Sequence, residues 1–506
     1  MKCKNCGSQI TEDAVFCPNC GTKRKKSYNN VILIAVLVVV LLGAILATLL
    51  YVRSTVNEED DYENVVFFSS LSNQFYNLKG DSYQPENIDS VYYSRLGEIT
   101  AYTEWEGESL NLFCFKEDMT PVSIAKDVCS VKISVTGEHV VYTTYDGENS
   151  YETTLYIYNV LKDKSIKIDT KVYPYEIALS PSGKAVAYLK DYEGYEDNTL
   201  YIAGINVKPK KIDKDGYYPV AISDNGKNLY YVNTNDKFYY YNGKDIQKIQ
   251  VDVGSSFWFN DSITEVLFTK GSRTYYFKPK MDEPVKIANY AMDDYLTGNS
   301  SMYMMDYCSN YGHVINKDTL KETLIFDDNT LLWINKDLTD VVKVASLSGY
   351  HYQLSENEKS FLFLENGDLY KVTNFNEEME PVLLYDDEYI SAFKASRDLS
   401  KIYLVTEENE LYYYRNNRKP VKLSTDITLE FSNLAYNEFI DKIYYIEDNK
   451  LFCAGTKNKS VTVMEEDTNT VYQFGNGIMF IKNTDYGMEY YYLKDKEAIK
   501  LYSTNE

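Results

Sequence analysis

The sequence has few of the residues that most catalytic centres use. It contains 3 histidines among 506 residues and no G-x-S-x-G motif, so a serine hydrolase with a nucleophile elbow is disfavoured. Its acidic clusters, such as Asp327–Asp328 and Asp386–Glu388, lack the D-x-D-x-D-G spacing of an EF-hand loop. We expect these clusters to be solvated loops, with calcium binding as the alternative.

Positive charge is scarce in most of the chain. The formal net charge is -23, and residues 1–53 hold seven Lys/Arg against two Asp/Glu, so the remainder carries -28. Phosphate binding needs a basic face, so nucleic acid is not expected as a partner. An acidic surface instead favours solubility of an exported domain.

One stretch lacks charge altogether. Residues 31–52 (VILIAVLVVVLLGAILATLLYV) are apolar apart from a threonine and a tyrosine. A helix of this length, at ~1.5 Å per residue, spans the ~30 Å hydrocarbon core of a bilayer. The run is longer than the apolar core of a signal peptide, and some thirty residues precede it. We therefore predict an uncleaved transmembrane helix over residues 31–52.

The flanks of this stretch predict its orientation. The basic run Lys23–Lys26 precedes it, whereas Arg53 and the acidic segment Glu58–Glu63 follow it. Basic residues stay on the cytoplasmic side of a membrane. The sequence thus predicts a cytoplasmic N-terminus, an acidic linker over residues 53–64 and an extracytoplasmic domain over residues 65–506.

Two C-x-x-C pairs occupy the first 26 residues. Cys3 and Cys6 form one pair, Cys17 and Cys20 form the other, and a glycine follows each pair. Four thiolates satisfy tetrahedral zinc, and a segment this short needs a metal in order to fold. Disulfides or a redox C-x-x-C are the alternatives, but a cytosolic location keeps thiols reduced. We predict one structural Zn²⁺ bound by these four cysteines, with no position left for catalysis.

The segment CKNCGSQITEDAVFCPNCG resembles the short zinc-ribbon family found at the N-termini of many bacterial membrane proteins. The resemblance covers residues 3–23. It implies structural zinc at Cys3, Cys6, Cys17 and Cys20. What partner the ribbon contacts is not fixed by this resemblance, and a cytosolic protein is one candidate.

The remaining residues repeat a strand-rich unit. The composition includes 51 Tyr and only 11 Pro, which favours strands. Turn motifs introduce apolar runs, as in Ala178–Leu189 and Ala221–Val232, and short aromatic runs follow. Taking the aromatic residue near the end of the first run as a landmark, the copies fall at Tyr102, Tyr142, Tyr188, Tyr231, Phe363, Tyr403, Tyr444 and Phe480.

A repeat of ~40–45 residues with this content is typical of the blades of a β-propeller. The wide gap before Phe363 predicts two further copies, with Phe268 and Tyr303 as candidates. Val65–Leu78 is predicted to be a partial copy that could complete the last blade. About ten units is more than most propellers have, so a large ring, two rings or larger blades all remain open, as does an open solenoid or sandwich.

The turn motifs SPSG (Ser180–Gly183) and SDNG (Ser223–Gly226) resemble those of TolB-like and related WD-type propellers of bacterial exported proteins. This resemblance implies the propeller fold over about residues 90–500 and says little about a ligand. The fold class we expect is therefore all-β, a β-propeller-like repeat preceded by a zinc ribbon and one transmembrane helix.

Isolated reactive residues in the large domain do not form a recognisable site. We expect His139 to be an ordinary surface residue, and His351 could line a channel. Cys114 and Cys453 are expected to be buried thiols, with a Cys114–Cys129 disulfide as an alternative. The sequence predicts no role for Cys308 or His313.

These observations predict a single-pass protein of a bacterial cell envelope, with a zinc ribbon inside and a ligand- or protein-binding propeller outside. Its expected partners are the membrane and an extracytoplasmic protein or glycan. The role is sensing, scaffolding or surface recognition without catalysis. The alternative is a propeller enzyme, a lyase or hydrolase acting on envelope polymers.

Overall fold

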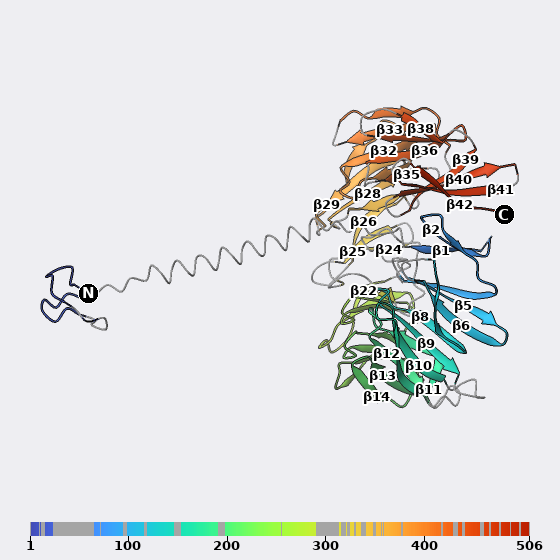
Figure 1. Cartoon of the computed structure of the whole chain (residues 1–506). Coiled ribbons are helices and arrows are strands. Elements are labelled where there is room, and N and C mark those ends of the chain that lie inside the picture. The colour runs from blue at the N-terminus through green and yellow to red at the C-terminus, as the bar shows by residue number, and fades with distance from the viewer. Residues whose placement is uncertain are drawn as a thin grey trace. The chain divides into compact units, whose positions relative to one another are not determined.

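A computed structural model of the chain divides into two compact units, Met1–Asp60 and Asp61–Glu506 (Figure 1). The structure describes residues 2–9, 11, 16–23, 65–70, 72–94, 99–115, 119–145, 153–190, 198–254, 256–289, 313–314, 320, 324–327, 330–334, 341–347, 351–355, 357, 359–375, 378–415, 418–428, 434–437, 441–455, 460–464, 467–474, 477–485, 487–494 and 497–504. The predicted transmembrane segment 31–52 and linker 53–64 lie outside these residues. Across the described ranges, no helix is long and apolar enough to cross a membrane.

The first unit contains two short loops of the same construction. Each is closed by an isolated β-bridge, Lys2 with Gln9 in one and Phe16 with Lys23 in the other. Each bridge brackets one C-x-x-C pair, so the backbone holds the two cysteines of a pair at the tip of a tight turn.

The second unit is built from sheets in which consecutive strands pair antiparallel, apart from one parallel pairing in the fifth group along the chain. Its first four groups are β1 (Val66–Ser69), β2 (Gln74–Asn77) and β3 (Ser82–Tyr83); β4 (Ile88–Tyr93), β5 (Thr100–Glu106), β6 (Ser109–Cys114) and β7 (Val122–Ala125); β8 (Val128–Ile133), β9 (His139–Tyr145), β10 (Thr153–Asn159), β11 (Lys164–Leu179), β12 (Ala185–Lys190), β13 (Thr199–Gly204) and β14 (Val207–Asp213); and β15 (Gly216–Ile222), β16 (Leu229–Asn233), β17 (Lys237–Tyr241) and β18 (Ile246–Val251).

The later groups follow the same plan. They are β19 (Phe257–Phe259), β20 (Val266–Lys270), β21 (Arg273–Phe277), β22 (Val285–Ala288) and β23 (His313–Val314); β24 (Leu324–Asp327), β25 (Thr330–Ile334) and β26 (Val341–Ser346); β27 (Tyr352–Leu354), β28 (Ser360–Glu365), β29 (Asp368–Thr373) and β30 (Val382–Tyr385); β31 (Ile390–Ala395), β32 (Lys401–Thr406), β33 (Leu411–Arg415) and β34 (Val421–Ser424); β35 (Leu434–Asn437), β36 (Lys442–Glu447), β37 (Lys450–Gly455) and β38 (Ser460–Met464); and β39 (Thr468–Phe474), β40 (Gly477–Thr484), β41 (Gly487–Lys494) and β42 (Glu497–Ser503).

The aromatic landmarks of the sequence repeat occupy equivalent places. Tyr102 lies on β5, Tyr142 on β9 and Tyr231 on β16, each the second strand of its group, and all three side chains are buried. Most groups have four strands, whereas the sequence repeat shows only an apolar run and the aromatic run that follows it. The fourth strands are half exposed and interrupted by bulges, as in β18, so their apolar pattern is weak.

The wide gap between Tyr231 and Phe363 contains two groups, as the spacing predicted. Phe268 lies on β20, the second strand of the first of them. The second is β24–β26, and its central strand β25 follows Phe268 by more than one repeat length. The other candidate landmark, Tyr303, lies outside the described residues.

One strand is shared by two successive repeats of the outer unit. β11 pairs with β10 through its first half and with β12 through its second half, so β8–β14 form one continuous seven-stranded sheet. Val172 pairs with both Thr153 and Lys190 at the changeover. Lys171, just before it, has a positive φ of 57°, which kinks the strand there.

Hydrophobic clusters join each unit to the next. One cluster, for example, unites Tyr142 of β9 with Leu112 of β6, and another unites Tyr231 of β16 with Leu189 of β12. The series continues through all the later groups. Because every sheet has apolar side chains on both faces, each must be covered by neighbours on both sides.

The first group of strands contacts both the second and the last. Phe75 of β2 packs with Tyr102 of β5, and Leu78 packs with Tyr492 and Leu501 of the last group. β2 accordingly lies beside β42 (Figure 1). The prediction that Val65–Leu78 would complete the last blade is corrected in its detail, because β1–β3 pair with one another as a separate sheet.

A repeated turn fixes one end of these units. Between the first and second strands, a serine or asparagine side-chain oxygen accepts the N–H of the residue five positions later. The residues that begin these turns are Ser94, Ser134, Ser180, Ser223, Asn260, Ser355 and Ser396. We call this end of the sheets the serine-turn end, and the opposite end, where second strands finish, the loop end.

Candidate metal centre

Two matching turns position the four cysteines. The N–H of Cys3 bonds to the carbonyl of Ser8, and the N–H of Gly7 bonds to the carbonyl of Cys3. The second pair repeats both bonds, from Cys17 to Thr22 and from Gly21 to Cys17. Gly7 and Gly21 have φ values of 76° and 67°, which glycine adopts without strain.

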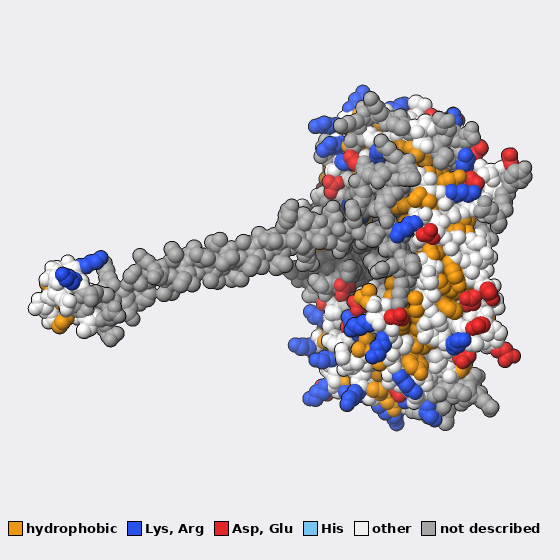
Figure 2. Space-filling model, viewed as in Figure 1, with side chains coloured by type: hydrophobic (Ala, Val, Ile, Leu, Met, Phe, Trp, Pro, Cys, Tyr) orange, Lys and Arg blue, Asp and Glu red, His pale blue; other side chains and the backbone are white. Residues whose placement is uncertain are grey.

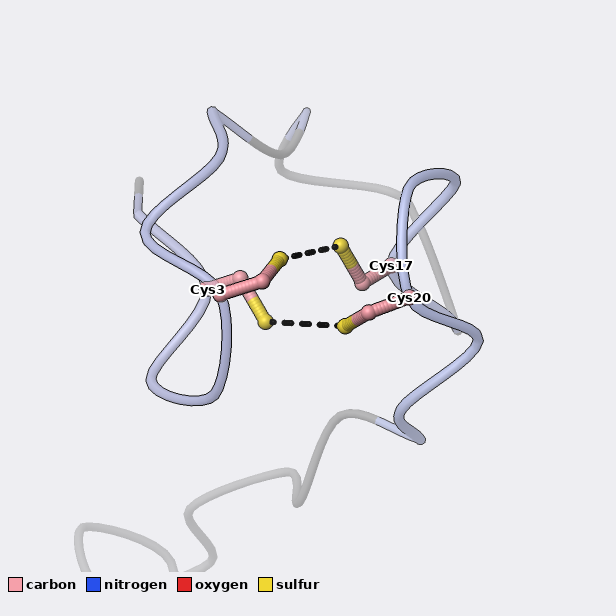
Figure 3. Close-up of side chains that lie close together, drawn as sticks. Cys3, Cys17 and Cys20 are labelled. Atoms are coloured by element: carbon pink, nitrogen blue, oxygen red, sulfur yellow. Dashed lines mark hydrogen bonds between the residues drawn. The ribbon is translucent and has the colours of Figure 1, made fainter.

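The sulfur atoms point toward one another across the two turns (Figure 3). All four lie within 4.8 Å of one another. The Cys3 and Cys20 sulfurs are 3.7 Å apart, and the Cys6 and Cys17 sulfurs are 3.6 Å apart. A tetrahedral zinc ion with Zn–S bonds of ~2.3 Å places its sulfurs about 3.8 Å apart, so the observed spacing fits zinc.

Two asparagines tie each turn to the sulfur of the other. Asn5 Nδ2 donates to Thr22 Oγ1 at 3.1 Å and to Cys20 Sγ at 3.9 Å. The mirror contacts join Asn19 Nδ2 to Ser8 Oγ at 2.9 Å and to Cys6 Sγ at 4.0 Å. The sequence analysis missed these residues, although the recurring pattern C-x-N-C-G-[S/T] was a signal for them.

The thiols differ in how readily they ionise. Hydrogen bonds with Ser8 lower the pKa of Cys6 to about 6, and hydrogen bonds with Thr22 lower the pKa of Cys20. Backbone hydrogen bonds from Asn19 and Cys20 also lower the pKa of Cys17, but burial and its neighbouring thiols outweigh them and raise it to about 11. A bound zinc ion would favour the thiolate form of all four.

The site is open on one side. Cys3 and Cys17 are buried, whereas Cys6 and Cys20 are exposed. When zinc is bound by four protein thiolates no coordination position is left for a substrate, so the chemistry of this donor set is structural. Elsewhere among the described residues, no other group of histidine, cysteine or carboxylate side chains is placed to hold a metal.

His139 is buried, so its prediction as an ordinary surface residue is wrong. Its side chain is 1% exposed, because the first residue of β9 faces the turn of the next unit. Nδ1 lies 2.6 Å from the Ser182 carbonyl, which can only accept, and Nε2 lies 2.8 Å from Asn159 Nδ2. The neutral ring with its proton on Nδ1 satisfies both contacts, and burial lowers the pKa of His139.

The contacts of His139 continue into a third unit. The N–H and hydroxyl of Ser182 both donate to Asp224 Oδ1, at 3.0 and 2.6 Å. Asn159, Ser182 and Asp224 belong to three successive units. His139 is therefore the centre of a structural link along the serine-turn end.

The other candidates remain separate. Cys114 and Cys453 are buried thiols, as predicted, and Cys129 is half-buried. None of the three is in a disulfide, so the alternative Cys114–Cys129 bridge does not form. His351 is half-buried with a pKa lowered by burial, and the cluster Asp386–Glu388 is exposed, as a solvated loop would be. Cys308 and Asp328 lie outside the described residues.

Comparison with known proteins identifies the first unit. Residues 2–24 match the zinc-ribbon domain family. No curated protein matches the chain.

Similar solved structures include the tricorn protease, TolB from Acinetobacter baumannii and a GH74 enzyme from Niastella koreensis. The tricorn protease is 14% identical, with a TM-score of 0.26, 85% of this chain covered and 56% of that chain. TolB is 14% identical with a TM-score of 0.26, and the match covers 43% of this chain and 56% of TolB. The GH74 enzyme is 8% identical with a TM-score of 0.29, and the match covers 88% of this chain and 92% of the enzyme. This chain thus spans 56% of the tricorn protease and of TolB.

Proposed function

We propose that this chain is a membrane-anchored binding protein of a bacterial cell envelope. Its zinc ribbon lies in the cytoplasm, residues 31–52 cross the membrane, and the all-β unit binds a ligand or protein outside without catalysing a reaction. The uncharged run and the basic residues before it support the anchor and its orientation.

The contact between the first and last groups of strands supports a binding role. Leu78 is 2% exposed and lies among Met479, Tyr492 and Leu501. We propose that the units form one closed propeller-like ring, in which β1–β3 fill the space between the last group and the first. A closed ring is a rigid support, and the loops at its rim are free to vary as a recognition surface.

The ribbon supports a structural zinc ion on the cytoplasmic side. In this proposal Cys3, Cys6, Cys17 and Cys20 hold one Zn²⁺, and the metal stabilises a segment too short to fold by apolar burial. Phe16 is 53% exposed beside Lys23, which leaves an apolar ring on the ribbon surface for a cytosolic partner.

Site-directed labelling tests the anchor and its orientation. Single cysteines are introduced at Lys23 in the ribbon and at Leu161, which is 89% exposed in the outer unit. In intact bacterial cells an impermeant maleimide should add label at Leu161→Cys and none at Lys23→Cys, relative to the unsubstituted protein. Permeabilised cells should label both. Labelling of Lys23→Cys in intact cells, or recovery of the protein in the soluble fraction, would refute this topology.

A further inference from the structure

Among the described residues of the outer unit, the large exposed hydrophobic side chains separate according to the end of the strands on which they lie. At the serine-turn end they are aliphatic: Leu161, Ile246, Val382 and Leu383. At the loop end they are aromatic apart from one methionine: Trp105, Tyr145, Tyr175, Tyr389 and Met488. Figure 2 shows hydrophobic side chains exposed among charged ones on the viewed side of the outer unit.

Three of these aromatic residues belong to successive units. Trp105 and Tyr145 occupy equivalent positions at the ends of β5 and β9, because each N–H bonds to the carbonyl just before its first strand, at 2.9 and 3.1 Å. Tyr175 lies beyond the kink of β11, where its ring packs edge-on against that of Tyr173 with centroids 5.4 Å apart. Their side chains are 40%, 44% and 51% exposed, respectively. We call these three residues the aromatic row.

The surroundings of the row are polar. The Trp105 indole N–H donates to Asp89 Oδ1 at 3.2 Å, which fixes the plane of the ring while leaving much of it in solvent. Asp89 also accepts a hydrogen bond from Thr103. Glu106, the last residue of β5, has 73% of its side chain exposed and pairs with Lys126 at 3.5 Å. Polar groups therefore accompany the exposed ring of Trp105.

We propose that the aromatic row binds a glycan chain that carries no net negative charge. The inference rests on the proposed binding function and names its ligand class. Sugar rings present C–H groups on their faces, which stack on aromatic rings, and hydroxyls on their edges, which donate to carboxylates such as Asp89. A protein partner would favour a contiguous apolar core, and the exposed aliphatic side chains lie at the other end.

The net charge of the outer unit further restricts the class of glycan that can bind. Residues 54–506 carry a net charge of -28, so a polyanionic glycan meets repulsion as it approaches. Neutral sugars, or amino sugars, do not meet this barrier. A row of three rings on adjacent units suits an extended chain of several sugars better than a single monosaccharide.

Tryptophan fluorescence gives a direct test, because Trp105 is the exposed member of the 3 tryptophans. Trp258 and Trp333 are 5% and 4% exposed. The purified full-length protein is titrated with cellohexaose, with a hexamer of N-acetylglucosamine and with polygalacturonate as the anionic comparison. At least one of the two hexamers should shift the emission to shorter wavelength, and polygalacturonate should not.

Variants connect that signal to the row. Trp105→Ala, Tyr145→Ala and Tyr175→Ala should each weaken binding about ten-fold or more by calorimetry, which corresponds to 1.4 kcal/mol. Trp105→Phe should keep most of the affinity while losing the fluorescence change, which guards against misfolding of the alanine variant. Leu161→Ala and Val382→Ala, at the serine-turn end, should bind as the unsubstituted protein does.

Two outcomes would overturn the glycan assignment. The first is that neither neutral hexamer binds, and the second is that binding survives all three alanine variants. A photo-crosslinker at Tyr145 that captures a protein, with no hexamer bound, would assign the row to a protein interface and leave the proposed binding function standing. Failure of the labelling test for topology would instead contradict the proposed function, whatever the row binds.

Discussion

The ring of Tyr76 stacks on the ring of Tyr502, with centroids 4.7 Å apart and an interplanar angle of 25°. Tyr76 belongs to the first group of strands and Tyr502 to the last strand, β42. Tyr490 continues the stack, 4.2 Å from Tyr502. The two ends of the outer unit therefore meet through side chains, without strand pairing between their sheets among the described residues.

Leu78→Ala tests the strength of this contact. Deleting a buried leucine side chain costs about 2–5 kcal/mol, and here the lost contacts belong to β40–β42. Hydrogen exchange should show that amides of 497–503 lose protection, although they are far from position 78 in the sequence. Leu112→Ala, equally buried between the second and third groups, is the matched control. Equal loss of protection at 497–503 in both variants would contradict a local contact.

Removal of one zinc ligand should affect the ribbon alone. Structural zinc contributes ~10–16 kcal/mol to zinc-finger peptides at neutral pH, so Cys20→Ser should abolish folding of residues 1–26. The zinc content measured by elemental analysis should fall from one ion per chain to none. A chelator should likewise remove the zinc and unfold the ribbon of the unsubstituted protein. Cys129→Ser should retain the zinc. The melting temperature of the outer unit should stay constant, and a shift of several degrees would show that the two units stabilise each other.

The two asparagines should tune how tightly the metal is held. Partners of metal ligands typically change metal affinity by about 10–100-fold when they are removed. Asn5→Ala and Asn19→Ala should each weaken zinc binding in competition with a chromogenic chelator, and the double variant should weaken it further. Lys4→Ala alters an exposed neighbour of the same turn and should leave the affinity unchanged. An unchanged affinity in the double variant would exclude this role.

Burial of His139 should make the stability of the outer unit depend on pH. Burial lowers its pKa in the folded state, so the unfolded chain takes up the proton first as the pH falls below about 6.5. The contribution is therefore fully present above that pH and is lost as the pH falls toward the folded pKa. The charged groups that face His139 are Glu138, Lys184 and Asp224.

The measurement compares thermal melting of the parent protein and His139→Gln at pH 8 and pH 5.5. Glutamine retains one polar contact and does not titrate, so the variant should lose less stability on acidification than the parent does. Carboxylates elsewhere change both proteins equally. A variant with the same acid sensitivity as the parent would show that the pKa of His139 is not lowered in the folded protein.

Glycine is needed at position 183 for two separate reasons. Its φ of 73° disfavours any side chain, and a Cβ there would lie 2.8 Å from His139 Cβ and 2.9 Å from Ser134 Cβ. Gly107→Ala is the control, since its φ is 67° but a Cβ would meet nothing within 4 Å. The control should cost about 1–2 kcal/mol for its backbone conformation. Gly183→Ala should cost a further ~1–3 kcal/mol of overpacking, measured by denaturant unfolding. Equal losses would mean that the neighbouring turns can separate freely.

The sequence predicted the repeats well because its landmarks lie on the strands that are buried on both faces. Such strands, β16 for example, read as continuous apolar runs. The zinc ribbon was predicted for a similar reason, since the cysteine spacing is dictated by the metal. The four-strand composition of each unit was missed because half-buried outer strands leave only a weak pattern.

Other features depended on contacts between distant segments. Nothing local distinguishes the start of β9 from a surface strand, so the burial of His139 became visible only when Ser182 and Asn159 lay against it. The separate sheet of β1–β3 likewise depends on partners at both ends of the chain. Local sequence patterns contain no information about such pairings.

The contact between the first and last groups has a consequence for synthesis of the chain. Translation at 5–20 residues per second separates completion of β3 from completion of β42 by on the order of 20–80 s. During that interval Leu78 and Tyr76 have no final partners, so β1–β3 expose an apolar face. A ribosome that stops early leaves this face uncovered permanently. Truncated chains should therefore be recognisable to chaperones and proteases by the first sheet they made.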